Sequence, residues 1–240
     1  MSGGPNCIIS GIGRARRPVS KKKRSGRRDH AAVANAPGLE VERRLWAAGQ
    51  IHVCGVDEAG RGPLAGPVVA GAVVLPSGVD LHSQLPGLND SKQLAPSQRS
   101  RLEEIIHQVA TARGIGLATV AEIDAINIRR ASLLAMKRAV TALAQTPSFL
   151  IIDGRDLLEE SVIPSVAVKG GDRTSASVAA ASILAKEARD RIMRALSREY
   201  PEYGWEHNMG YPTAEHRRAL RQFGITPHHR RTFKPVAELL

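Results

Sequence analysis

The sequence predicts an α/β fold in which about five strands form one sheet and helices cover its faces. Two patterns alternate along the chain from about residue 50 onward. Short runs rich in valine, isoleucine and leucine are typical of buried strands. Longer segments repeat apolar residues every three or four positions, as helices with one buried face do. This alternation indicates helices packed against a sheet.

The first half of this region predicts three strands and one helix. Ile51–Val56 and Val68–Leu75 are rich in β-branched residues, and a loop rich in glycine and proline separates them. They predict two consecutive strands with a functional connection. Pro96–Ala110 places its leucine, isoleucine and valine residues on one face, which predicts a helix. Gly114–Val120 is the third predicted strand.

The second half predicts two more strands and three helices. Ile126–Ala144 has helical periodicity, and Phe149–Ile152 is short and wholly apolar, as a buried central strand is. Val162–Val168 is a less favourable strand because it contains a proline. Ser175–Arg198 is rich in alanine and should form the longest helix. Thr213–Gln222 predicts a final helix that is capped by its first residue.

The composition is that of a globular protein with one folded domain. The chain has 240 residues, of which 42% are hydrophobic, and it contains no visible internal repeat. Its longest apolar run, residues 67–76, has about half the length of a membrane-spanning helix. The two cysteines provide no disulfide framework, and the N-terminus has no apolar secretory segment. We therefore expect a cytoplasmic protein that does not contact membranes.

Positive charge is concentrated near the N-terminus. The net charge is +11, and residues 1–48 contain 11 lysines and arginines against three acidic residues. Lys21–Arg28 (KKKRSGRR) is typical of a disordered basic arm that attracts polyphosphates, although a targeting signal or a segment without a specific role would explain it as well. We therefore predict an arm at residues 1–48 and a nearly neutral folded domain at 49–240. We expect removal of residues 1–45 to leave that domain intact.

Acidic residues follow several of the predicted strands. Asp57 and Glu58 come directly after the first strand, Asp153 follows the fourth, and Asp172 lies soon after the fifth. An isolated Asp-Glu pair is most often a solvated turn or a helix cap, but sites in α/β proteins assemble at the carboxyl ends of strands. Carboxylates that meet there repel one another unless cations neutralise them, and oxygen ligands suit Mg²⁺ or Mn²⁺. Two such ions about 3.5–4 Å apart can direct water at a phosphodiester, so the pattern indicates a nuclease.

Several motifs resemble those of ribonuclease HII, the bacterial type 2 ribonuclease H. The run Gly55–Leu75 (GVDEAGRGPLAGPVVAGAVVL) resembles the opening of that family. Further similar motifs follow in the family's order, within residues 50–235, at Asn89–Lys92 (NDSK), Ile123–Asn127 (IDAIN), Ile152–Gly154 (IDG), Lys169–Asp172 (KGGD), Ala179–Lys186 (AAASILAK), Arg189–Asp190 (RD) and His207–Pro212 (HNMGYP). The resemblance implies a ribonuclease H-like fold, with a mixed central sheet flanked by helices and a helical C-terminal segment that closes over a duplex.

The same resemblance implies a reaction and a substrate. The enzyme would hydrolyse the RNA strand of RNA/DNA hybrids and would cut 5′ of single ribonucleotides embedded in duplex DNA. Its products would carry a 3′-hydroxyl and a 5′-phosphate. Two Mn²⁺ or Mg²⁺ ions would be held by the four catalytic carboxylates Asp57, Glu58, Asp153 and Asp172. We expect a monomer, and the sequence identifies no protein partner.

Further residues match positions that contact the substrate in this family. Backbone groups of Gly60, Arg61 and Gly62 would recognise the 2′-hydroxyl, and Tyr211 would pack against the neighbouring sugar. Four other positions contact a phosphate or are ordinary turn and helix residues with about equal odds, namely Ser91, Lys92, Ser182 and Lys186. The Lys-Gly-Gly-Asp run at 169–172 has one glycine more than many relatives, which leaves open the reach of Lys169 and the position of Asp172.

Other polar residues have simpler interpretations. Asp156 is expected in a turn, Asp190 in an i,i+4 pair with Lys186, and Asp124 at a helix cap, so none is predicted as a metal ligand. The histidines of the C-terminal region lack zinc spacing and are expected at the surface or facing nucleic acid, namely His207, His216, His228 and His229. Alternative functions are those of ribonuclease HIII, a recombination nuclease or a non-catalytic RNA/DNA-binding module.

Overall fold

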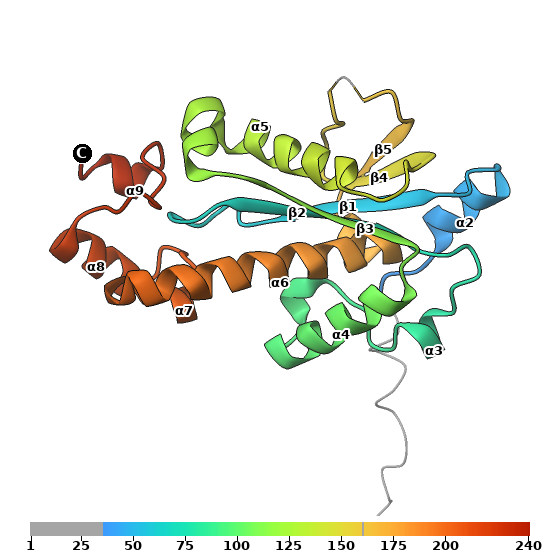
Figure 1. The fold of residues 1–240 in the computed structure, drawn as a ribbon, viewed down its shortest axis with the longest axis horizontal. Helices are drawn as coiled ribbons and strands as arrows, with labels where there is room; N and C mark the ends of the chain where they lie inside the picture. Colours follow the sequence, from blue (N-terminus) through green and yellow to red (C-terminus); the bar gives the residue numbers. More distant parts are fainter. Residues whose placement is uncertain (1–35, 160) are drawn as a thin grey trace, which may run out of the picture.

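A five-stranded mixed sheet forms the centre of the computed structural model, which describes residues 36–159 and 161–240 (Figure 1). The order of its strands is β3-β2-β1-β4-β5. The first three strands are antiparallel neighbours, whereas β4 runs parallel to β1 and β5 runs parallel to β4. The strands are β1 (Val53–Ala59), β2 (Val68–Val74), β3 (Ala112–Ala118), β4 (Phe149–Asp153) and β5 (Ser165–Val168). The predicted mixed sheet flanked by helices is therefore confirmed.

Helices cover both faces of the sheet, with α5 on one face and α6 on the other (Figure 1). The larger helices are α4 (Pro96–Val109), α5 (Val120–Thr141), α6 (Ala176–Glu199) and α8 (Ala214–Phe223). Shorter elements are α2 (Glu40–Ala47), α3 (Leu81–Gln84), α7 (Trp205–Asn208), α9 (Lys234–Ala237) and the 3-10 turns η1 (Ser91–Gln93), η2 (Gly171–Arg173) and η3 (Pro201–Tyr203). No helix in the described residues is long and apolar enough to cross a bilayer.

Helix α6 lies unusually close to the sheet. A Cβ atom added at Gly55 of β1 would collide with the backbone of Ser177, and one added at Gly71 of β2 would collide with the carbonyl oxygen of Ala181. Glycines on the strands and alanines on the helix therefore let the two backbones approach each other. This contact fixes α6 beneath β1, the strand that carries Asp57.

Several predicted boundaries differ from the structure. The first strand, predicted at 51–56, runs from Val53 to Ala59 and therefore includes Asp57 and Glu58. The strand predicted at 114–120 lies at Ala112–Ala118, because Thr119 and Glu122 already cap the next helix. That helix was predicted to begin at Ile126 but begins at Val120, and a kink at Asn127, where φ is 68°, divides it. The Asn127 side chain accepts a hydrogen bond from the backbone N–H of Arg130, so this residue does begin the second half of the helix.

The acid expected at a helix cap performs another role. Asp124 accepts hydrogen bonds from the backbone N–H groups of Arg231 and Thr232 at 3.0 Å, and from the Thr232 hydroxyl at 2.7 Å. The capping prediction is therefore wrong, because Asp124 binds the C-terminal segment to α5.

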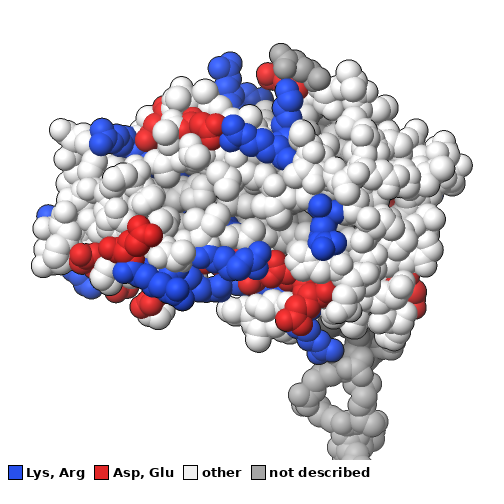
Figure 2. All heavy atoms as spheres, in the orientation of Figure 1, with Lys and Arg blue, Asp and Glu red and all other residues white. Residues whose placement is uncertain are grey.

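The folded region begins before residue 49. Helix α2 falls within the predicted arm, yet its Glu42 is fully buried and Leu39 before it belongs to the core. Residues 39–45 therefore belong to the folded part, and we no longer expect their removal to leave the domain intact. The remainder of the predicted arm, residues 1–35, lies outside the described residues. Figure 2 shows that both signs of charge are interspersed on one face of the folded part, in keeping with its near-neutral composition. A short basic band lies over α6 on this face.

The C-terminal segment has its own small core. Trp205 is fully buried, and its indole N–H donates to Nε2 of His216 at 3.1 Å. Nε2 of His229 lies 3.0 Å from the same atom, and burial is the main reason that the pKa of His229 falls to about 3. His216 and His229 were expected at the surface. That prediction is wrong for both because their rings complete this core.

Candidate active site

The four predicted carboxylates come from three neighbouring parts of the fold. Asp57 and Glu58 lie near the end of β1, and Asp153 is the last residue of the parallel strand β4. Because Val56 pairs with Ile152, Asp57 and Asp153 occupy corresponding positions on adjacent strands. Asp172 lies in the turn η2, just before α6. The structure therefore brings these four residues together near the carboxyl ends of β1 and β4.

Burial and mutual repulsion disfavour ionisation of this cluster. Burial is the largest cause that raises the pKa of Asp57 well above its usual value, and the charges of Glu58 and Asp153 raise it further. The pKa values of Glu58 and Asp153 are also raised, again mainly by burial. The buried Oδ2 atom of Asp57 has no hydrogen-bond partner among the described residues. An unpaired buried carboxylate oxygen surrounded by like charges is an environment that a cation would stabilise.

Basic side chains and backbone N–H groups bind the carboxylates in this arrangement. Lys92 Nζ lies 3.2 Å from Asp172, and Arg61 Nη1 lies 3.2 Å from Glu58. Within the described chain, no three Asp, Glu, His or Cys side chains are already positioned to hold a metal ion. The oxygen-only donor set fits Mg²⁺ or Mn²⁺.

The additional glycine before Asp172 does not move this residue away from the cluster. Gly170 adopts a left-handed conformation with φ of 69°, and the N–H of Gly171 donates to Asp153 Oδ1 at 2.7 Å. Asp172 is buried and faces Lys92. Lys169 is exposed at the end of β5. The glycine pair forms the turn that joins η2 to Asp153.

The predicted recognition loop begins directly after β1. Gly60 has a φ of 99°, and a Cβ atom at this position would collide with the side chain of Arg189. A Cβ atom at Gly62 would lie 3.6 Å from Cε1 of Tyr211, so the tyrosine ring lies beside the loop although it is far away in sequence. Tyr211 is exposed, with 44% of its surface accessible. Loop and ring together form one accessible surface next to Glu58 and Arg61.

The two predicted serines lie beneath the cluster. Ser91 Oγ and Ser182 Oγ are 2.8 Å apart, and both residues are buried. Ser182 also lowers the pKa of Asp57, against the larger effects of burial and repulsion. Ser182 therefore lies next to Asp57, and Ser91 contacts Ser182. Lys92 is the most exposed residue of the Asn89–Lys92 run.

Lys186 forms the i,i+4 pair that its spacing predicts. Its Nζ atom lies 2.6 Å from Asp190, which also lies 3.3 Å from the guanidinium of Arg99. Arg99 is held 2.8 Å from Glu187. This largely buried network joins α4 to α6, and Asp190 is therefore part of the packing. Asp156 lies in the loop after β4 and pairs with Arg129 at 2.6 Å.

Two buried arginines near the loop are not among the predicted site residues. Arg189 and Arg230 are at most 1% exposed, and both donate hydrogen bonds to carbonyl oxygens of residues 60–67. Arg189 lies in a noted motif, whereas Arg230 lies in a basic run that looks like exposed surface. A single sequence contains no pattern that distinguishes such an arginine from its exposed neighbours.

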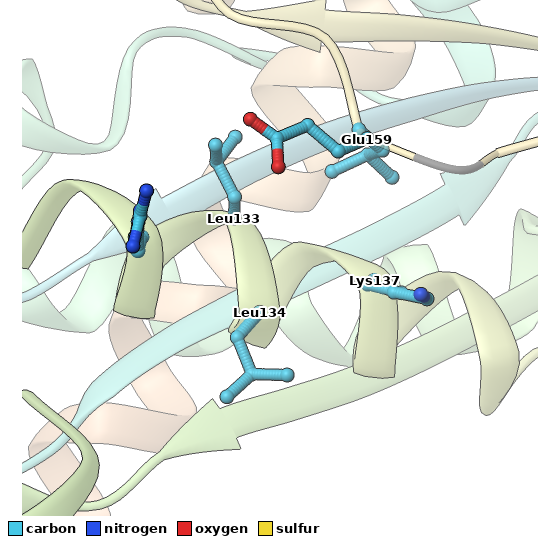
Figure 3. Close-up of a pocket in the computed structure, with 6 residues that line it drawn as sticks. Leu133, Leu134, Lys137 and Glu159 are labelled. Carbon is cyan, nitrogen blue, oxygen red and sulfur yellow. The ribbon is translucent and has the colours of Figure 1, made fainter. Parts of the chain in front are cut away.

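A separate pocket of about 390 Å³ lies on the outer side of α5 (Figure 3). None of the four carboxylates contributes to it. Its lining residues are Arg130, Leu133, Leu134, Lys137, Leu158 and Glu159. This pocket is therefore distinct from the carboxylate cluster.

Comparisons with known proteins agree on one family. A model of ribonuclease HII matches residues 54–236. Ribonuclease HII of Ruegeria pomeroyi is 54% identical over 205 residues, which are 85% of this chain and 85% of that relative. The ribonuclease H2 structure from Pyrococcus horikoshii OT3 has a TM-score of 0.67 and 29% identity, over 78% of this chain and 96% of that one. A Bst ribonuclease HIII solved with Mn²⁺ shares the fold at a TM-score of 0.61 but is only 19% identical, over 92% of this chain and 75% of that one.

Proposed function

Since the chain belongs to the ribonuclease HII family, we propose that it cuts duplex DNA on the 5′ side of single ribonucleotides as well as the RNA strand of hybrids. The chain is a metal-dependent endonuclease that hydrolyses phosphodiester bonds. The observation that carries the proposal is the cluster of four carboxylates beside an exposed backbone loop. Its products would be a 3′-hydroxyl and a 5′-phosphate.

The proposed site assigns binding of two divalent cations to Asp57, Glu58, Asp153 and Asp172. Asp57 has an unpaired buried oxygen, and Asp153 keeps its second oxygen after binding the N–H of Gly171. Mg²⁺ or Mn²⁺ bound there would supply the Lewis acidity for attack of water on the phosphodiester. Lys92 and Arg61, released from the carboxylates, would then be available to the phosphates on either side.

The proposed recognition surface consists of the loop and the tyrosine. Backbone groups of Gly60, Arg61 and Gly62 would contact the 2′-hydroxyl, which is what distinguishes RNA from DNA at one position. The Tyr211 ring lies against this loop and would pack on the sugar of the neighbouring deoxyribonucleotide. We propose hybrids and ribonucleotide-containing duplexes as the partners of a monomeric, cytoplasmic enzyme.

Cleavage of a DNA duplex that contains one ribonucleotide tests this function directly. With Mg²⁺ or Mn²⁺, we expect one cut on the 5′ side of the ribonucleotide and multiple cuts in a continuous hybrid. Addition of EDTA should stop cleavage of both substrates. Undiminished cleavage in EDTA would contradict the carboxylate site, and binding without cleavage under all conditions would indicate a binding module.

Substitution of Tyr211 by Ala should selectively impair cleavage at a single ribonucleotide. We expect kcat/KM on that substrate to fall by about 5- to 100-fold, because stacking contacts with nucleotides contribute about 1–3 kcal/mol each. The loss on a continuous hybrid should be much smaller, since a second 2′-hydroxyl already crowds the ring there. Phe223→Ala is a matched control, because Phe223 is a similarly exposed aromatic residue on α8. Equal losses on both substrates would exclude the proposed role of Tyr211.

A further inference from the structure

The guanidinium groups of two buried arginines, Arg189 and Arg230, bind the loop between β1 and β2 from the protein interior. The guanidinium of Arg230 donates to the carbonyl oxygens of Gly60 at 2.6 Å, Arg61 at 3.0 Å and Gly66 at 2.8 Å. Arg189 donates to the carbonyl oxygens of Ala65, Pro67 and Met209, at 3.0, 3.0 and 2.9 Å respectively. The interior side of the loop is thus bound almost entirely through its main chain.

Neither guanidinium has a carboxylate partner within 4 Å in the described part of the chain. Burial is the main cause that lowers the pKa of Arg189 to about 10 and that of Arg230 to about 9, so both remain charged at neutral pH. A buried charge is costly unless hydrogen bonds compensate it. Here the loop carbonyls supply that compensation, and the loop conformation and the charged arginines therefore depend on each other.

The direction of the loop carbonyls determines the direction of its N–H groups. In a trans peptide the C=O and the following N–H point in opposite directions. Since the carbonyls of Gly60 and Arg61 point inward to Arg230, the N–H groups of Arg61 and Gly62 point away from it. Arg61 and Gly62 are both exposed, and these two N–H groups have no hydrogen-bond partner among the described residues. The loop therefore presents two adjacent free donors on its outer side.

Arg230 differs from Arg189 in which part of the loop it binds. Arg230 contacts the carbonyls of both peptides that carry the free donors and also that of Gly66. Arg189 packs against Gly60, but its hydrogen bonds go only to the far end of the loop and to Met209. The ring of Phe233 lies 5.0 Å from the Arg230 guanidinium carbon and restricts its position. An amide held by a buried cation is also polarised, which strengthens its N–H as a donor.

We propose that Arg230 is a positioning residue for ribose recognition, which orients the N–H groups of Arg61 and Gly62 toward the oxygen of a 2′-hydroxyl. This inference rests on the proposed function. Arg230 itself does not touch the substrate. It acts by fixing the two peptides that do.

The test compares binding of two duplexes that differ by one oxygen atom. One is a DNA duplex with a single ribonucleotide, and the other is the same duplex without the 2′-hydroxyl. Binding is measured with Ca²⁺, under conditions in which the wild-type protein cuts neither duplex. We expect Arg230→Lys to reduce affinity for the ribonucleotide duplex by about tenfold, the scale of one lost hydrogen bond to a polarised donor, and to change affinity for the all-DNA duplex less than about twofold.

Two further variants separate positioning from folding. Arg230→Gln removes the buried charge as well as the hydrogen bonds and provides a second chance of a folded variant, as judged by its melting temperature. Arg189→Lys alters an equally buried arginine at the far end of the loop and should retain most of the ribose preference. An unchanged preference in a folded Arg230 variant would overturn the inference, as would an equal loss of affinity for both duplexes. If the wild-type protein has no ribose preference and cuts neither substrate with Mg²⁺, the proposed function fails as well.

Discussion

Asp57→Asn should reduce cleavage by about 10³-fold or more while duplex binding stays close to that of the wild-type protein. The amide keeps the shape of the side chain but removes the charge that the cluster needs to hold cations. Asp153→Asn should have the same effect, since the two residues occupy corresponding positions on adjacent strands. The measurement is single-turnover cleavage of the ribonucleotide duplex at saturating Mg²⁺, with binding measured separately.

The same substitution should stabilise the metal-free protein. Burial and the neighbouring acids raise the pKa of Asp57, so its ionised form is disfavoured in the folded state. A carboxyl with a raised pKa reduces stability as the pH rises above its unfolded value, and it has no such effect at lower pH, where both states are protonated. Asp57→Asn in EDTA should therefore raise Tm near pH 7.5, by roughly 2–4 °C for each kcal/mol gained in the free energy of unfolding. This gain should shrink toward pH 4.

Asp156→Asn provides the control for this prediction. Asp156 lies three residues after Asp153 but is only partly buried, and its pKa is lowered by the hydrogen bond from Arg129. The same change there should leave cleavage unaltered. Near-normal turnover of Asp57→Asn or Asp153→Asn would remove the carboxylate assignment, whatever the control does.

A chain that begins at residue 46 should melt roughly 10 °C lower than the full chain and lose most of its activity, because it lacks nearly all of α2. Glu42 of α2 accepts hydrogen bonds from the Ser175 hydroxyl at 2.6 Å and from the Ser177 N–H and hydroxyl at 2.9 and 2.7 Å. The carbonyl of Gly38 also accepts from the N–H of Ala176 at 2.8 Å. Each hydrogen bond to a charged group contributes about 1.5–3 kcal/mol. These contacts hold the start of α6, which directly follows Asp172.

A chain that begins at residue 36 should retain both stability and catalysis. Residues 1–35 contain nine lysines and arginines and one aspartate, so we expect their removal to weaken duplex binding and to flatten its dependence on salt. An unchanged salt slope would show that these residues make no phosphate contacts. In the full chain, Glu42→Ala should reproduce most of the thermal destabilisation, whereas Glu40→Ala, at an exposed position of the same helix, should not. Full stability of the chain that begins at residue 46 would contradict the role of α2.

Short-range sequence patterns were enough to predict most strands and helices and the acidic residues next to them. The short apolar run before Asp153 and the alanine-rich segment after Ser175 became β4 and α6, because burial on both sides requires such residues. The early start of α5 could also have been predicted, since Thr119 and Glu122 form a capping box. This signal was in the sequence and was overlooked.

Long-range partners explain the rest of the differences. In the sequence, Glu42 resembles any acidic residue of a charged helix. Its partners Ser175 and Ser177 come more than 130 residues later in the chain. Arg230 likewise becomes buried only when residues 60–67 fold against it. Charged residues are mostly exposed, so their burial here follows from the tertiary structure and from no local pattern.

Helix α6 fixes the distance between the carboxylate cluster and the loop at residues 60–67. It starts beside Asp172, passes Ser182 beneath Asp57, and reaches Arg189 behind the loop that faces Tyr211. The part of α6 from its first residue, Ala176, to Arg189 spans roughly 20 Å at 1.5 Å per residue. One inserted residue would turn everything beyond it by about 100° and remove Arg189 from its carbonyl partners. The separation between Asp172 and the loop that Arg189 binds is therefore set in whole residues, and the helix can diverge in composition far more easily than in length.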